Sequence, residues 1–107
     1  MTKHLVTLGL LLAGSVTMAS AQAADGKTVY DAQCKKCHGA TGTPAGAMAK
    51  KFPKMAAFDA AFLAKHSEDS IVTILTKGKN ADMKAFKEKM SADEMKAVAK
   101  YMHTLGK

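Results

Sequence analysis

The chain has 107 residues, of which 48% are hydrophobic and only 6% aromatic, with no Trp. This length allows one domain at most. The net charge is +7, from 16 cationic residues that are all Lys against nine acids, and the absence of Arg argues against a dedicated nucleic-acid binder. Two Cys are too few for a disulfide-rich fold, and a chain so poor in aromatics has difficulty in building a core.

The first 23 residues have the pattern of a secretory signal peptide. Lys3 precedes a strongly apolar run over residues 5–13, and small residues follow up to a small-x-small site that ends at Ala23. We expect cleavage after Ala23, with cleavage after Ala21 as the alternative. An uncleaved membrane anchor is the weaker interpretation, because the apolar run is well short of the roughly 20 residues that a spanning helix needs.

Cleavage would remove 23 of the 107 residues and one lysine, and would leave residues 24–107 as one domain of 84 residues with a net charge of +6. That domain would lie outside the cytoplasm, in an oxidising compartment, with no stable insertion into the membrane. The shorter chain makes the shortage of core residues more severe.

The first half of this domain shows weak helical patterns. A helix is predicted from about residue 26 to residue 34, with Asp25 as its N-cap. Gly and Pro residues over 39–46 predict a loop. A helical turn is expected between residues 59 and 65, where apolar residues are spaced as on one helix face.

The second half has the clearer patterns. A short helix is predicted between Ser67 and Gly78, and a longer one begins at a capping box formed by Ser91 and Glu94. The longer helix has an apolar stripe at spacings of three and four: Met95, Val98, Ala99, Met102 and Leu105. No alternating strand pattern exceeds four residues, so the predicted fold is all-α, with three to five helices and long irregular connections.

Both cysteines lie in the string Cys34-x-x-Cys37-His38, the attachment signature of c-type haem. Two thiols on adjacent turns of a helix can each form a thioether with one haem vinyl group, and His38 is then forced beneath the iron as its proximal ligand. The other ring nitrogen of His38 needs an orienting partner, for which a carbonyl near Thr43 and Pro44 is a candidate.

Other uses of the two cysteines fit the sequence less well. A disulfide is possible in an exported chain, but a thioredoxin-like dithiol needs a βαβ context, and a zinc site needs a second pair of ligands. The adjacent His38, the export signal and the helical pattern together favour haem. Haem would also fill the core, so we expect the chain without it to be largely unfolded.

Several residues are candidates for the sixth ligand of the iron: Met48, Met55, Met83, Met90, Met95, Met102, His66 and His103. The last three methionines are expected to pack in the core or beside a helix cap, and the two histidines to be solvated on the surface. Met48 and Met55 remain as alternatives on a loop near the attachment string. Met83 is favoured, because it stands in a non-helical link that can fold across the face opposite His38.

Over nearly all of residues 24–107 the chain resembles the class I cytochromes c, a monohaem type common in bacterial periplasms. The similar elements are Gly26 and Tyr30 before the attachment string, a Pro-x-Met segment ending at Met55, and an ungapped stretch from Met83 to Tyr101. The resemblance implies one covalent haem c whose iron has His38 and Met83 as axial ligands, and first and last helices that cross. Lys84 stands where the family usually has Pro, whose ring would stiffen the Met83 loop.

The resemblance and the motif together predict an electron-transfer protein that is not itself an enzyme. With both axial positions filled, no substrate can bind the iron, and single electrons pass through the haem edge to redox-partner proteins. The lysines would attract partners with acidic docking surfaces if they surround that edge. One alternative is a haem subunit fixed in a larger oxidase or reductase complex. A less favoured one is a peroxidase or sensor with a labile sixth ligand, which Lys84 alone suggests.

Overall fold

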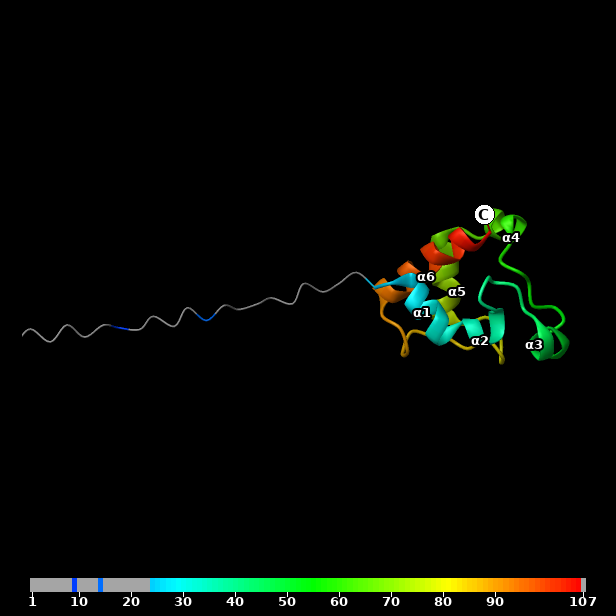
Figure 1. Cartoon of the computed structure of the whole chain (residues 1–107), viewed down its shortest axis with the longest axis horizontal. Helices are drawn as coiled ribbons and strands as arrows, with labels where there is room; N and C mark the ends of the chain where they lie inside the picture. Colours follow the sequence, from blue (N-terminus) through cyan, green and yellow to red (C-terminus); the bar gives the residue numbers. More distant parts are fainter. Residues whose placement is uncertain (1–8, 10–13, 15–23, 107) are drawn as a thin grey trace, which may run out of the picture.

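The computed structural model describes residues 24–106 and the isolated residues Gly9 and Gly14. The rest of the predicted leader, residues 1–23, lies outside the described residues. Residues 24–106 form helices and no strand (Figure 1). The helices are α1 (Gly26–Gln33), α2 (Lys35–His38), α3 (Gly46–Lys51), α4 (Ala60–Lys65), α5 (Glu68–Lys77) and α6 (Ala92–Leu105).

The all-α prediction is confirmed, but the described part of the chain has six helices rather than three to five. The difference comes from two short helices. α2 is a single turn separated from α1 by Cys34, whose φ of −120° interrupts the helix. α3 has neither a side-chain cap nor a buried residue, so nothing in its sequence distinguishes it from a loop.

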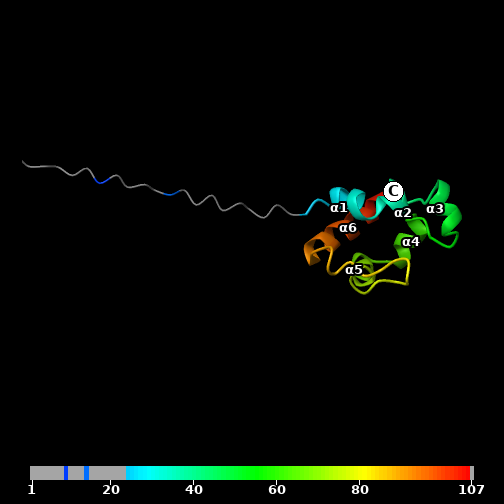
Figure 2. The ribbon, with the colours of Figure 1, turned by 90° about the horizontal axis from the view of Figure 1, so that it is seen from below.

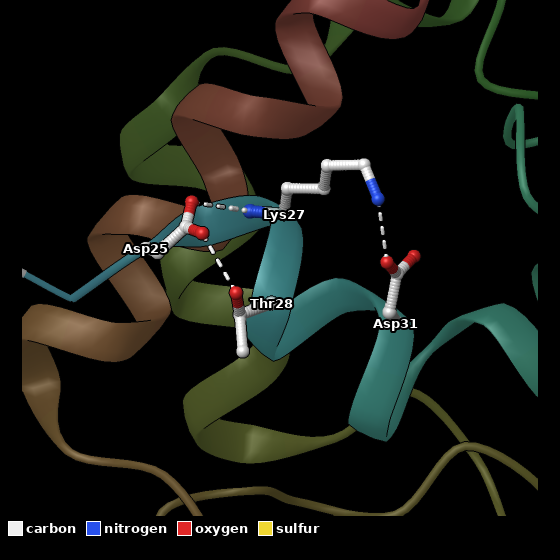
Figure 3. Close-up of polar contacts among 4 residues, drawn as sticks. All are labelled: Asp25, Lys27, Thr28 and Asp31. Atoms are coloured by element: carbon white, nitrogen blue, oxygen red, sulfur yellow. Dashed lines mark hydrogen bonds and ion pairs between the residues drawn. The ribbon is translucent and has the colours of Figure 1, made fainter.

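Side-chain caps fix where the predicted helices begin, as α1 and α6 show. The Asp25 carboxylate accepts hydrogen bonds from the backbone N–H of Lys27 at 3.3 Å and from the Thr28 hydroxyl at 2.7 Å (Figure 3). At α6 the capping box forms as predicted, with the Ser91 hydroxyl accepting from Glu94 N–H and the Glu94 carboxylate accepting from Ser91 N–H. These bonds satisfy amides that have no partner within the helix.

α6 packs between α1 and α5, as the view from below shows (Figure 2). The crossing with α1 is close because Gly26 has no side chain. A Cβ atom at Gly26 would collide with the Ala97 carbonyl oxygen and lie 2.9 Å from the Cβ of Tyr101. The rings of Tyr30 and Tyr101 then meet with centroids 5.3 Å apart. The crossing of the first and last helices is therefore confirmed.

The core is small and entirely apolar in character. Its most deeply buried large side chains are Tyr30 and Val98, and the described residues bury no charged group. Met90, Met95 and Met102 belong to this core, as predicted. The complete buried set is Val29, Tyr30, Cys34, Phe58, Ile71, Leu75, Met90, Met95, Val98, Ala99 and Met102. Cys34 is part of the attachment string, and Phe58 stacks on His38 of the same string, so the core extends up to that string.

α3 lies apart from the α1–α6–α5 layer in both views (Figures 1 and 2). The end of α6 instead approaches α4, because a Cβ atom at Gly106 would lie 3.2 Å from the backbone nitrogen of Ala60. None of the helices in the described ranges has the length and apolar character needed to cross a membrane.

Candidate functional site

The attachment string forms one tight turn at the end of α1. The backbone N–H of Cys34 donates to the Tyr30 carbonyl at 2.8 Å, and the N–H of His38 donates to the Cys34 carbonyl at 2.9 Å. Cys37 N–H also donates to the Cys34 carbonyl, at 3.2 Å. These bonds place Cys34 and Cys37 one helical turn apart, with His38 directly after them. This is the local geometry that two thioethers to one haem require.

No disulfide joins the two cysteines, and Cys34 is buried while Cys37 is partly exposed. Burial, together with the neighbouring Cys37, raises the pKa of the Cys34 thiol to about 11. A reactive dithiol needs the opposite shift, because the thiolate is the nucleophile. The part of the chain that the structure describes also contains no cluster of three or more His, Cys, Asp or Glu side chains that could hold a metal ion. Neither a redox dithiol nor a zinc site is supported.

The imidazole of His38 lies against the core. Its ring stacks on Phe58, with centroids 4.7 Å apart and an angle of 28° between the planes. Burial, and to a smaller extent the charge of Lys79, lowers the pKa of His38. Both effects favour the neutral imidazole, which is the form that ligates iron.

The orienting partner predicted for His38 is not present as a hydrogen bond. Nδ1 of His38 is buried and has no partner among the described residues. The Thr43 carbonyl approaches Gly39 instead, where a Cβ atom would collide with it and where φ is +79°. A buried nitrogen without a partner is rare, so the predicted orienting hydrogen bond is missing at a position where one would be expected.

Tyr30 connects α1 to the residue that follows His38. Its hydroxyl donates to the Gly39 carbonyl at 2.7 Å, and its side chain is completely buried. Burial also raises the pKa of Tyr30, so the hydroxyl stays a donor at all ordinary pH values. This contact and the Phe58 stack were not predicted, because each joins residues that are distant in the sequence and no local pattern indicates either.

Met83 lies on the loop between α5 and α6. Among the methionines that are only partly buried, it alone packs against the core in the described part of the chain. The loop is drawn together at its base, where Phe86 N–H donates to the Leu75 carbonyl at 2.7 Å. Lys79, at the start of the loop, is close enough to His38 for its charge to lower the His38 pKa. The Met83 loop therefore lies near the attachment string.

The two alternative methionines are placed differently. Met48 is on α3 rather than on a loop, and Met55 follows that helix. Both are partly buried, but neither belongs to the set of residues packed against the core. The structure thus separates Met83 from Met48 and Met55 by its packing.

The prediction that His66 and His103 are solvated is wrong. Both side chains are partly buried, and Nε2 of His103 lies 2.8 Å from the His66 carbonyl oxygen. The His66 ring also lies 4.3 Å from that of Phe62 between centroids. Because the end of α6 packs beside α4, these imidazoles fill space between two helices that the sequence pattern does not bring together.

The geometry agrees with comparisons to known proteins. The family model described as cytochrome c oxidase, cbb3-type, subunit III matches residues 21–102. The cbb3-type cytochrome c oxidase subunit CcoP of Azospirillum brasilense is 33% identical over 89 residues, which is 81% of this chain. The chain spans only 30% of the length of that relative.

A solved structure has the same fold. KustC0563 c-type cytochrome is 32% identical, with a TM-score of 0.69, and the superposition covers 78% of this chain and 99% of that one. This match shows that residues 24–106 have the fold of a c-type cytochrome. The chain therefore belongs to the cbb3-type subunit III family of cytochromes c, and it is a haem c protein whose function is electron transfer.

Proposed function

We propose that residues 24–107 form an exported, periplasmic electron carrier with one haem c, produced by cleavage of the leader after Ala23. Cys34 and Cys37 would form the two thioethers, and His38 and Met83 would ligate the iron. The observation that supports this most directly is the single turn that presents both thiols and a partly buried imidazole in succession. These residues fit a covalently attached haem better than a disulfide, a dithiol or a zinc site.

Each of these residues has a distinct part in the proposal. The bound haem supplies an iron that exchanges single electrons. Phe58 and Tyr30 hold His38 and its neighbour Gly39 in place, which limits the rearrangement of the imidazole when the charge on the iron changes. Met83 would supply a further ligand to the iron, so that no substrate could bind the metal and the protein would not itself be an enzyme.

The exposed lysines are an argument for redox partners with acidic docking surfaces. Lys35 and Lys36 lie in the attachment string, and further lysines follow it or surround Met83. All of these are exposed: Lys35, Lys36, Lys50, Lys51, Lys54, Lys77, Lys79, Lys84, Lys87 and Lys89. Exposed like charges around one end of a small domain attract oppositely charged partners and raise the rate of encounter.

An ionic-strength series tests this attraction. Reduction of the ferric holoprotein by hexacyanoferrate(II), an anion, is expected to slow several-fold as salt rises from about 0.01 M to 0.5 M, because the Debye length shrinks from roughly 30 Å to a few Å. The matched control is a cationic reductant, hexaammineruthenium(II), whose rate should rise over the same series. Equal and salt-independent rates with both reagents would refute electrostatic attraction.

A second candidate function is a haem subunit held within an oxidase complex, which the similarity to CcoP favours. Fractionation of the native cells separates the two. A free carrier is expected in the osmotic-shock fluid, as a covalent haem protein with the mass of residues 24–107 plus one haem. Haem staining confined to membranes, and released only by detergent together with an oxidase, would support the fixed subunit and contradict the free carrier.

A further inference from the structure

Two backbone N–H groups of the Met83 loop are held by the side chain of one residue, Asn80. The side-chain oxygen Oδ1 of Asn80 accepts from the backbone N–H of Met83 at 2.8 Å and from that of Asp82 at 3.0 Å. Asn has this capacity because its short side chain can take the place of a backbone carbonyl in a turn. One side chain thereby fixes two consecutive amides, including that of Met83 itself.

The carbonyl group of Met83 is also bound by residues at the start of the loop. It accepts from Lys79 N–H at 2.9 Å and from Asn80 N–H at 3.3 Å. Gly78, with φ of +77°, makes this turn possible, since a Cβ atom there would lie 2.7 Å from the backbone nitrogen of Ala85. Both polar groups of the Met83 backbone are therefore bound by the residues that begin the loop.

These bonds bear directly on Lys84. Proline at this position would restrict the loop through its fixed φ and its effect on the preceding residue. Lys84 imposes no such restriction, and its N–H makes no backbone hydrogen bond in the described part of the chain. The restraint on Met83 comes instead from the N-terminal side of the loop.

We propose that Asn80 is a positioning residue that holds Met83 in place for the haem iron and substitutes for the restraint that a proline after Met83 would give. The proposal rests on Met83 being the sixth ligand. In the part of the chain that the structure describes, the hydrogen bonds of Asn80 go to the backbone of the loop and none goes to the thiols or to His38. Any opening of the iron–sulfur bond that involves movement of the Met83 backbone would have to break these hydrogen bonds.

The test compares three variants of the ferric holoprotein: Asn80→Ala, Asn80→Asp, and Asn80→Ala with Lys84→Pro. The measurement is the rate at which imidazole, a neutral ligand, replaces the native sixth ligand. Asn80→Ala removes two hydrogen bonds and is expected to bind imidazole at least about three- to tenfold faster, the factor that corresponds to one ordinary hydrogen bond. Asn80→Asp keeps an acceptor oxygen and should stay near the wild-type rate. The added proline, which removes no hydrogen bond, should bring the rate of imidazole binding most of the way back down to the wild-type value.

A second readout does not depend on ligand exchange. In the reduced protein, the amide hydrogen of Met83 should exchange with solvent several-fold faster in Asn80→Ala than in wild type, because its acceptor is gone. Asp82→Ala is the matched control: it removes a neighbouring side chain but leaves Asn80 Oδ1, and both readouts should be unchanged.

The outcomes separate this proposal from the one on which it rests. If ferric wild type lacks the absorption band of an iron–sulfur bond, the assignment of Met83 fails. If that band is present but Asn80→Ala keeps the wild-type imidazole rate and amide exchange, Asn80 has no positioning role. The proposal would also be overturned if Asn80→Asp bound imidazole as fast as Asn80→Ala, or if the added Lys84→Pro did not slow Asn80→Ala. In either case the faster binding would not come from a loss of restraint on the loop.

Discussion

Replacement of both cysteines by alanine is expected to abolish covalent haem and, with it, most of the helical structure. The core that remains is small: Tyr30 and Val98 are its largest fully buried side chains. Folded domains are stable by only about 5–15 kcal/mol, so a domain of this size has little reserve once a large apolar group is lost from its interior. Cys34 is itself part of the core, beside Tyr30 and Phe58.

Far-ultraviolet circular dichroism and haem staining after denaturing electrophoresis measure this loss. The matched control is Lys35→Ala with Lys36→Ala, which alters the same string at two exposed positions and should leave covalent haem and helix content unchanged. A Cys34→Ala, Cys37→Ala protein that has wild-type ellipticity without haem would show that the polypeptide folds alone. The view that haem completes the core would then be wrong.

Met83→Ala is expected to lower the reduction potential by on the order of 0.1–0.3 V, a fraction of the roughly 0.8 V range over which axial ligands set haem potentials. A thioether sulfur stabilises ferrous iron relative to ferric iron, and its removal admits water, which favours the ferric state. Potentiometric titration followed by absorbance gives the midpoint directly.

Met55→Ala is the control for this change. Met55 is also partly buried, but it is not among the residues packed against the core. Its replacement should leave the potential almost unchanged. A large drop in Met55→Ala or Met48→Ala, together with a wild-type potential in Met83→Ala, would assign the ligand to Met55 or Met48 instead.

The hydrogen bonds of the Met83 loop bear on the alternative of a haem sensor or peroxidase. Such activity needs an open or labile sixth position. In wild type the Met83 backbone is bound through both its N–H and its carbonyl, so Lys84 does not leave the loop unrestrained. The loop geometry thus removes most of the support that the missing proline gave to this alternative.

Structure that depends on neighbouring residues could be predicted from the sequence. The Ser91–Glu94 capping box and the stripe behind it determine α6, and Asp25 sets the start of α1. Each rests on hydrogen bonds or side-chain spacing within one or two turns, which a sequence shows directly. The attachment string belongs to the same class, because its chemistry is determined by the spacing of five consecutive residues.

Contacts between distant residues could not be predicted in this way. The stack of Phe58 on His38 and the approach of His103 to the His66 carbonyl join elements far apart in the sequence. α3 was missed because its sequence has no cap and no buried face. Asn80 is a different case: its bonds are local, but their importance depends on where the loop folds, and only the structure shows that.

The central claim is a haem whose iron is held between His38 and Met83, and the ferric absorption spectrum tests it most directly. Iron–sulfur ligation gives His/Met haems a weak charge-transfer band at the red end of the visible spectrum. We predict that wild type has this band and that Met83→Ala lacks it, while both keep covalent haem. A wild-type spectrum without the band, or a Met83→Ala spectrum that retains it, would contradict the account.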